Sequence, residues 1–202
     1  MQHPLGVILA GGLATRMGGG DKGLLSLGGE TLLGRVIGRL EPQVAALALN
    51  ANGDSGRFAG LGLPVLADSV AGYAGPLAGV LAGLDWAAAQ GAESIVTAAA
   101  DTPFFPEDLV PRLLLAGEGM AHPLVLAATR EGGRLNRHPT FGLWPVALRD
   151  DLRAALEGGL RKVVLWTDGH GGRVAEFPTA PFDPFFNVNT PEDLAEAERL
   201  AG

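Results

Sequence analysis

A glycine-rich segment near the N-terminus carries two cationic side chains that could bind phosphate. Residues 11–22 hold five glycines together with Arg16 and Lys22, and they follow the apolar run Leu5–Leu9, which is typical of a buried strand. Glycine lets backbone N–H groups turn toward a ligand because no Cβ stands in the way. A glycine-rich loop after a strand is a common cradle for anions. The spacing therefore predicts a phosphate-binding loop in preference to a flexible surface turn.

This loop differs from the two commonest phosphate-binding motifs. A Walker A motif needs Ser or Thr after its lysine to hold magnesium, but Lys22 is followed by Gly23. The dinucleotide fingerprint Gly-x-Gly-x-x-Gly does not directly follow the strand, because its spacing occurs in this loop only at Gly18, Gly20 and Gly23. The loop therefore indicates phosphate chemistry of another kind.

A single carboxylate, Asp101, follows the apolar run Ser94–Ala99. Ligands of open parallel sheets bind beyond the carboxyl ends of the strands. Mg²⁺ is bound there by one or two carboxylates and by phosphate oxygens of the substrate. The alternative, a helix N-cap, is weaker because Asp101 lies five residues before Pro106, where the next helix is predicted to begin. We therefore predict that Asp101 binds a magnesium ion.

Two amides, Asn187 and Asn189, lie just before a helix start signal. Thr190-Pro191 with Asp193 supplies a Thr cap, a Pro at the first helical position and an acid at the third. Extended alternation would place both amides on one face. They suit metal or phosphate contacts, although either could instead organise the turn.

Asn50 and Asp68 end two further apolar runs and should lie at the same sheet edge as Lys22 and Asp101. A carboxylate there can accept hydrogen bonds from the N1–H and N2–H₂ groups of guanine together, a pairing that adenine and cytosine do not offer. Asp68 could instead bind the ribose hydroxyls, or form a turn with Ser69. Base selection by Asp68 is therefore our hypothesis.

Two basic segments could contact an anionic second substrate. The first includes Arg137 and His138, and the second includes Arg161 and Lys162. Solvated surface charge is an equally good interpretation of both. No Gly-x-Ser-x-Gly motif occurs, so the pattern of a serine hydrolase is missing.

Composition narrows the classes of protein. The 202 residues suffice for one domain with a sizeable core, and no cysteine is present. The net charge of −7 argues against a broad nucleic-acid footprint and against adhesion to an anionic membrane. No apolar stretch reaches the ~18 residues of a membrane span, and the N-terminal apolar run lacks the basic flank of a signal peptide. We expect a cytoplasmic protein without nucleic-acid or membrane partners.

Apolar runs alternate with helical patterns along the chain. This βαβα rhythm predicts an α/β fold, a three-layer sandwich with a mostly parallel, Rossmann-like twisted sheet. The segment Arg130–Thr140 is polar and contains glycine, and it is predicted to be a loop over the active face. The predicted strands are Pro4–Ala10, Ala45–Asn50, Leu63–Ala67, Ser94–Ala99 and Leu124–Thr129. The predicted helices are Thr31–Leu40, Pro76–Gln90, Pro106–Ala116, Pro145–Glu157 and Pro191–Ala201.

Taken together, these motifs resemble those of nucleotidyltransferases that make sugar nucleotides, and most closely the molybdenum cofactor guanylyltransferase family. The matching segments are Leu9–Gly12 with Arg16 and Lys22, Gly75–Gly79, Asp101–Pro103 and Asn187–Pro191. The resemblance implies one nucleotidyltransferase domain over residues 1–202, with the nucleotide bound by the N-terminal half and the second substrate by the C-terminal half. It implies magnesium-dependent transfer of GMP from GTP to molybdopterin or its molybdenum-bearing form. Proteins that load the cofactor or mature molybdoenzymes would be its protein partners.

The resemblance also assigns roles to single residues. Arg16, Lys22 and Asp101 would be catalytic, Asp101 with Asn187 and Asn189 would hold the metal, and the second substrate would meet Arg137, His138, Arg161 and Lys162. In the family an Asn of the C-terminal motif completes the metal site or approaches the second substrate. A cytidylyltransferase acting on the same pterin, another small nucleotidyltransferase, or a non-catalytic nucleotide-binding module are the alternatives. The implied nucleotide contacts are Leu9, Ala10, Gly11, Gly12, Lys22, Asn50, Asp68, Gly75, Pro76 and Asp101.

Overall fold

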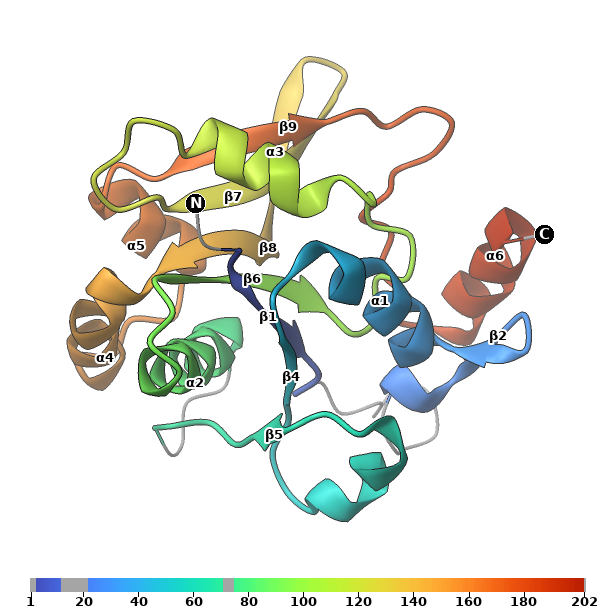
Figure 1. The fold of residues 1–202 in the computed structure, drawn as a ribbon. Coiled ribbons are helices and arrows are strands. Elements are labelled where there is room, and N and C mark those ends of the chain that lie inside the picture. The colour runs from blue at the N-terminus through green and yellow to red at the C-terminus, as the bar shows by residue number, and fades with distance from the viewer. Residues whose placement is uncertain (1–2, 12–21, 71–74, 202) are drawn as a thin grey trace.

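The central element of the protein is a mixed sheet with helices on both faces (Figure 1). The computed structural model describes residues 3–11, 22–70 and 75–201. Within them the sheet has seven strands in the order β5-β4-β1-β6-β8-β7-β9. The strands are β1 (Leu5–Leu9), β4 (Leu47–Asn50), β5 (Val65–Leu66), β6 (Ser94–Ala99), β7 (Val125–Glu131), β8 (Arg134–Pro145) and β9 (Arg173–Phe177), and a separate small hairpin pairs β2 (Ser26–Leu27) with β3 (Glu30–Thr31).

Six helices lie between or after these strands along the described chain. They are α1 (Leu32–Leu40), α2 (Pro76–Ala89), α3 (Leu109–Ala116), α4 (Arg149–Glu157), α5 (Val163–Gly169) and α6 (Pro191–Ala201). Short 3₁₀ turns cover Lys22–Leu24, Glu41–Gln43, Ser55–Leu61 and Val146–Leu148. No helix in the described part of the chain is both long and apolar enough to span a membrane.

The strands that were predicted to carry the site are parallel and in register. β1 pairs with β4 on one side and with β6 on the other, and Leu9 lies opposite both Asn50 and Ala99. Among the described strands of the seven-stranded sheet, only β8 runs against its neighbours, since it pairs antiparallel with β6 and β7. The predicted fold class is confirmed, and the carboxyl ends of β1, β4 and β6 meet at one edge.

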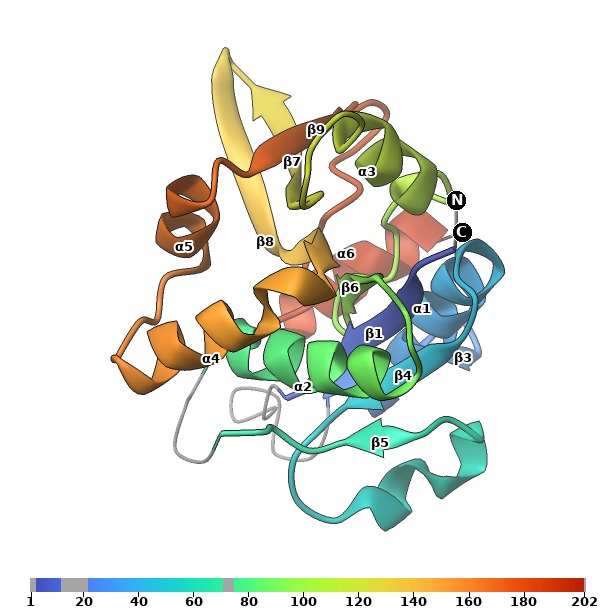
Figure 2. The same cartoon turned by 60° about the vertical axis from the view of Figure 1, so that its left-hand side comes forward.

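Two apolar cores cover the two faces of the sheet, as a three-layer sandwich requires. Alternate residues of each strand point to opposite faces, so Ile8 lies in the core under α1 and α3, and Val7 lies in the core under α2, α4 and α5. Figure 2 shows α2 and α4 side by side on their face of the sheet, where Arg153 of α4 contacts Asp85 of α2.

Two glycines of α2 face the sheet at positions where a larger residue would not fit. A Cβ at Gly83 would come within 2.8 Å of side-chain atoms of both Val7 and Ile95. A Cβ at Gly79 would overlap the side chain of Asn50 and come within 2.9 Å of Leu9. Only glycine leaves this room, so these positions set the distance between α2 and the end of β1.

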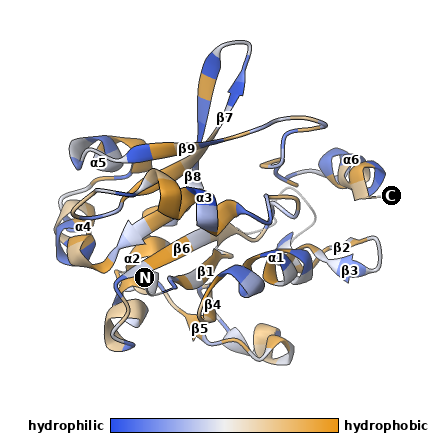
Figure 3. Ribbon diagram, turned by 45° about the horizontal axis from the view of Figure 1, so that its top comes forward, coloured by the Kyte–Doolittle hydropathy of each residue, from blue (hydrophilic) through white to orange (hydrophobic). Residues whose placement is uncertain are grey.

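The prediction of a loop over Arg130–Thr140 is wrong. β7 and β8 form a hairpin in which Glu131 pairs with Arg134, and its hydrophilic tip projects beyond the rest of the molecule (Figure 3). Gly132 and Gly133 both have positive φ angles, 55° and 83°, as a two-residue hairpin turn requires. The polar composition obscured a strand that is solvated near its tip, although the Gly-Gly pair was a hairpin signal.

An irregularity in this hairpin directs one residue toward the sheet edge. Ala127 of β7 pairs with His138, whereas the preceding residue Leu126 pairs with Gly142. The residues of β8 between these two partners therefore have no register partner in β7, which is a bulge. Thr140 lies in this bulge and reaches the pocket described below.

Other differences concern element boundaries and elements that were not predicted, among them β9, α5 and the β2–β3 hairpin. Helix α3 begins at Leu109 and α4 at Arg149, each a few residues after the predicted proline start, and a 3₁₀ turn precedes α4. The edge strand β9 pairs in parallel with β7. The short helix α5 follows the predicted basic segment with Arg161 and Lys162, and the helix itself was not predicted. Both elements depend on tertiary packing more than on local pattern.

The C-terminal helix forms a third, smaller core with the β2–β3 hairpin. Val188 and Ala197 pack there with Leu27, Leu32 and Phe104. The predicted start signal of the helix is confirmed, because the backbone N–H of Asp193 donates to Thr190 Oγ1 and the Asp193 carboxylate accepts from the N–H groups of Asn189 and Thr190. The helix thus fixes the amide-bearing segment that precedes it.

Candidate active site

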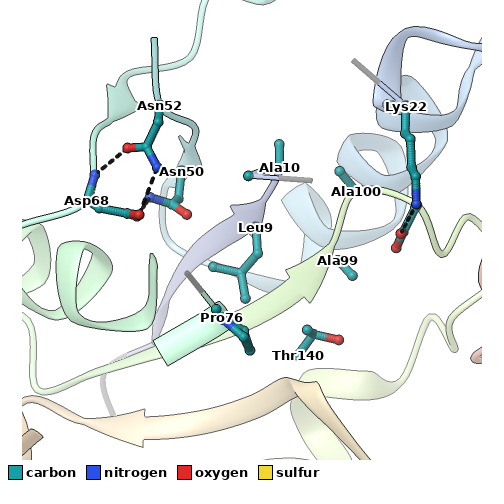
Figure 4. Close-up of a pocket in the computed structure, with 14 residues that line it drawn as sticks. Leu9, Ala10, Lys22, Asn50, Asn52, Asp68, Pro76, Ala99, Ala100 and Thr140 are labelled. Carbon is teal, nitrogen blue, oxygen red and sulfur yellow. Dashed lines mark hydrogen bonds and ion pairs between the residues drawn. The ribbon is translucent and has the colours of Figure 1, made fainter. Parts of the chain in front are cut away.

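A pocket of about 400 Å³ opens at the carboxyl ends of β1, β4 and β6 (Figure 4). We call it the edge pocket. It brings together all the described residues for which nucleotide contacts were predicted, although the contacts themselves stay a prediction. Its lining residues are Leu9, Ala10, Gly11, Lys22, Gly23, Asn50, Asn52, Asp68, Gly75, Pro76, Ala99, Ala100, Asp101 and Thr140.

One end of the edge pocket holds a cation between two oxygen-bearing side chains. The ammonium of Lys22 donates to Asn189 Oδ1 at 2.6 Å and lies 3.9 Å from Asp101 Oδ2. Lys22 begins the 3₁₀ turn that leads into the β2–β3 hairpin, and its carbonyl accepts from the backbone N–H of Leu25. This end can neutralise the negative charge of a phosphate.

The carboxylate of Asp101 is partly buried beside Lys22. Burial raises the pKa of Asp101, and this effect outweighs the opposing attraction of Lys22 and the hydrogen bond from Thr102. The backbone N–H of Val188 donates to the Asp101 carbonyl at 2.9 Å, which ties the C-terminal segment to the end of β6. A desolvated carboxylate with one cation at 3.9 Å favours a further positive charge nearby.

The hydroxyl of Thr102 links Asp101 to Asn187. It is fully buried, donates to Asn187 Oδ1 at 2.6 Å, and lies 3.3 Å from Asp101 Oδ1. Asn187 and Asn189 are therefore both linked to Asp101, but through different intermediaries. The link to Asn187 is the hydroxyl of Thr102, and the link to Asn189 is the ammonium of Lys22.

An aromatic cluster holds the segment that carries these two amides. The ring of Phe185 stacks on His138 at 4.2 Å and packs edge-on against Phe141 and Phe177. Aromatic pairs at such distances stabilise a fold beyond the area they bury. Phe185 thereby anchors the chain two residues before Asn187.

The donor set at this end suits a magnesium ion. Mg²⁺ prefers oxygen ligands and is commonly held by one or two carboxylates together with substrate phosphates. Asp101 supplies the carboxylate, and Asn187 and Asn189 supply amide oxygens from one segment. Clusters of three or more His, Cys, Asp or Glu side chains do not occur within residues 3–11, 22–70 and 75–201.

The other end of the edge pocket presents a carboxylate held by two amides. Asp68 Oδ1 accepts from Asn50 Nδ2 at 3.0 Å, and Asp68 Oδ2 accepts from Asn52 Nδ2 at 2.7 Å. Figure 4 shows this group on the opposite side of the pocket from Lys22, with Leu9, Ala10 and Ala100 between them. The pocket is thus polar at both ends and apolar in the middle.

The residues predicted to meet a second substrate lie outside the lining of the edge pocket. Arg137 pairs with Asp168 at 2.6 Å, and Arg161 donates to the carbonyl of Leu160. His138 shares a hydrogen bond with Thr129, and burial lowers its pKa against the opposing charge of Asp183. Lys162 is the residue that precedes α5. From this strand region, Thr140 is the residue that reaches the pocket.

Some predicted residues are not placed by the structure, and others were not predicted from the sequence. Gly12 and Arg16 lie outside the described residues. Asn52 and Thr102 had no assigned role, yet both bond directly to predicted site residues. The signal for Asn52 was its place two residues after Asn50, and the signal for Thr102 was its place next to Asp101.

Comparison with known proteins decides the family. Residues 6–170 match the MobA-like NTP transferase domain. The chain belongs to the MobA-like NTP transferase family. This MobA-like chain is 56% identical to the molybdenum cofactor guanylyltransferase of Rhodopseudomonas palustris strain BisB5, over 98% of this chain and 95% of that protein. It is 52% identical to the protein of the same name from Mesorhizobium japonicum, over 96% and 94% of the two chains.

Solved structures show the same fold at lower identity. Molybdopterin-guanine dinucleotide biosynthesis protein A from Archaeoglobus fulgidus superposes with a TM-score of 0.71 at 24% identity, covering 98% of both chains. The 4-diphosphocytidyl-2C-methyl-D-erythritol synthase from Anaerococcus prevotii gives a TM-score of 0.75 at 14% identity, covering 99% of this MobA-like chain and 96% of that chain. The fold is therefore shared by proteins whose names differ in both nucleotide and acceptor.

Proposed function

We propose that this protein transfers GMP from GTP to molybdopterin, or to its molybdenum-bearing form, and releases pyrophosphate. The observation that carries the proposal is the division of the edge pocket into two polar ends. Lys22 and Asp101 at one end suit the triphosphate and its metal, and Asp68 at the other end suits the nucleoside. The names of the relatives at 52–56% identity supply the acceptor and the choice of GTP.

In this reaction the protein positions the two substrates and neutralises the negative charge of the phosphates. A terminal phosphate oxygen of the pterin attacks the α-phosphorus of GTP in line, a new P–O bond forms, and the bond to the β-phosphate oxygen breaks so that pyrophosphate leaves. The attacking oxygen is already ionised, so no general base is needed. Lys22 neutralises charge on the phosphates as it develops. Arg16 has the same predicted task but lies outside the described residues.

Magnesium is part of the proposal. Asp101 would hold the ion, with an amide oxygen of Asn187 or Asn189 completing its protein ligands. When bound, the ion supplies positive charge against the triphosphate oxygens. The partly buried Asp101 carboxylate, whose pKa is raised, supports this role because a second cation would offset its desolvation.

The second substrate would approach from the side of β8. Thr140 lies in the bulge of β8 and lines the edge pocket, and His138 lies just before it beside the Phe185 cluster. Arg137 precedes His138 in β8, and Arg161 and Lys162 precede α5; these three cations would attract an anionic pterin. The product would pass to proteins that load the cofactor or mature molybdoenzymes, and we expect these reactions in the cytoplasm.

A complete reaction with purified components tests the proposal. The protein is mixed with GTP, magnesium and molybdopterin, and the dinucleotide product and pyrophosphate are both quantified. We expect both to form in equal amounts and to disappear when the pterin or magnesium is omitted. GTP binding without pyrophosphate release under complete conditions would identify a nucleotide-binding module instead.

A further inference from the structure

We infer that Asn52 is a positioning residue for nucleotide recognition, because its side-chain amide holds the Asp68 carboxylate in the orientation that meets the nucleotide. The inference deepens the proposed function and rests on it. Asn52 lies two residues beyond the end of β4 and lines the edge pocket together with Asn50 and Asp68 (Figure 4).

The side-chain amide of Asn52 makes two hydrogen bonds with Asp68. Its Nδ2 donates to Asp68 Oδ2 at 2.7 Å, and its Oδ1 accepts from the backbone N–H of Asp68 at 2.9 Å. One planar amide therefore bonds both the side chain and the main chain of the same residue. This arrangement fixes the side-chain torsion of Asp68 relative to its backbone, which a single bond would leave freer.

Asn50 also bonds to the Asp68 carboxylate, but its amide makes a second hydrogen bond to another residue. Its Nδ2 is shared between the carbonyl of Leu66 at 3.1 Å and Asp68 Oδ1 at 3.0 Å. Each carboxylate oxygen of Asp68 thus accepts one amide hydrogen. A carboxylate offers about four lone-pair sites, so about two stay available for donors of a ligand, one on each oxygen.

The main chain on both sides of this pair is held independently. Arg57 donates to the carbonyl of Asn52 at 2.7 Å. Ser69, the residue after Asp68, donates to Asp85 on α2, and Arg153 on α4 donates to both oxygens of Asp85. Removing the Asn52 amide therefore leaves the Asp68 carboxylate with the single bond from Asn50, while the segment that carries it stays tethered.

Asn52 should therefore affect nucleotide binding and have little effect on the rate of the chemical step. The side chain of Asn52 bonds to Asp68, whereas Lys22 and Asp101 lie at the other end of the pocket. Loss of its amide should weaken nucleotide binding through Asp68 and leave the rate at saturating nucleotide nearly unchanged. Loss of one well-placed hydrogen-bonding group typically changes a binding constant about tenfold.

A double-mutant cycle on GTP binding tests the inference. Dissociation constants for GTP with magnesium are measured by calorimetry, without molybdopterin, for the wild type, Asn52→Ala, Asp68→Ala and the double variant. We expect Asn52→Ala to raise Kd about tenfold in the wild type, and less than about twofold when Asp68 is already Ala. Equal effects in both backgrounds would overturn the inference, because Asn52 would then act independently of Asp68.

Two further variants serve as controls. Asn52→Asp keeps the size of the side chain but replaces its donor by a second carboxylate, so Kd should rise more than in Asn52→Ala; binding equal to the wild type would contradict the inference. Gln90→Ala removes another carboxamide at the far end of α2, and it should leave Kd unchanged. Asn52 is exposed, so we expect the Asn52 variants to have melting temperatures near that of the wild type. Asn52→Asp can replace Asn52→Ala in the cycle.

The same measurements separate this inference from the proposed function. If the wild type does not bind GTP, the proposed function fails and the inference falls with it. If the wild type binds GTP and Asn52→Ala binds it equally well, only the inference fails. Kinetics add a second readout, since KM for GTP should rise about tenfold in Asn52→Ala while kcat stays within about twofold.

Discussion

The ammonium of Lys22 donates to the side-chain oxygen of Asn189 at 2.6 Å, although 167 positions separate the two residues in the sequence. The bond joins the turn after the glycine-rich segment to the segment before α6. Because the N–H of Val188 also donates to the backbone carbonyl of Asp101, one C-terminal segment contacts both charged residues of the site. The C-terminal segment therefore supports the edge pocket through Lys22 and Asp101, although its residues are not among those that line the pocket.

Replacing Lys22 by Ala should lower kcat/KM by roughly 10²–10³. A preorganised charge aimed at the transition state is typically worth ~3–4 kcal/mol. Steady-state pyrophosphate release measures the effect. Asn189→Ala leaves the ammonium in place but removes its acceptor, so the loss should be smaller than in Lys22→Ala. Near-normal turnover in Lys22→Ala would remove this residue from the mechanism.

Replacing Asp101 by Ala should abolish magnesium-dependent turnover without unfolding the protein. The carboxylate lies at a strand end, and burial raises its pKa, so its charged form does not favour the folded state at neutral pH. Thermal unfolding should therefore show a melting temperature equal to or above that of the wild type. Turnover retained at ordinary magnesium concentrations would contradict the assignment of Asp101 as a metal ligand.

Replacing Asp68 by Ala should reduce selectivity for GTP. A carboxylate that accepts two hydrogen bonds from guanine faces only acceptors on cytosine N3 and O2, and such a mismatch permits strong discrimination. We expect a higher KM for GTP and little change in the residual activity with CTP. If Asp68 binds the ribose hydroxyls instead, both nucleotides should weaken by similar factors. Measuring both on the same variant separates these outcomes.

Stability at acidic pH should depend on His138. Burial lowers its pKa in the folded state, so the unfolded chain binds the proton more readily. This residue costs no stability above about pH 6.5, and stability is lost as the pH falls from about 6.5 toward the lowered pKa. The decrease in melting temperature from pH 7.5 to 5 should therefore be smaller in His138→Gln than in the wild type. The exposed His122→Gln is the control, and equal decreases in all three proteins would contradict the argument.

Local sequence patterns predicted the elements that build the edge pocket. The runs that became β1, β4 and β6 are short and apolar because both faces of these strands are buried, and they end where polar residues begin. Parallel strands bring their carboxyl ends to one edge, so the order of apolar runs and polar residues alone was enough to place Asn50 and Asp101 together. The capping pattern at Thr190 and Asp193 likewise marked the start of α6.

Elements that depend on distant partners could not be predicted in this way. β8 is solvated near its tip and buried near its end, so it shows neither clear alternation nor a continuous apolar run. The pairing of β9 with β7 joins segments far apart in the chain. For the same reason, the sequence indicated that Asn189 belongs to the site but not that it binds Lys22. The two hydrogen bonds between Asn52 and Asp68 likewise form only because the segments after β4 and β5 meet in the folded chain.

Nucleotide preference in the complete reaction tests the central claim most directly. kcat/KM is measured for pyrophosphate release with each of the four common nucleoside triphosphates, in the presence of molybdopterin and magnesium. We expect GTP to be used far better than CTP, ATP or UTP, and release to cease without the pterin. A preference for CTP, or pyrophosphate release that does not require molybdopterin, would contradict the assignment of this protein as a molybdenum cofactor guanylyltransferase.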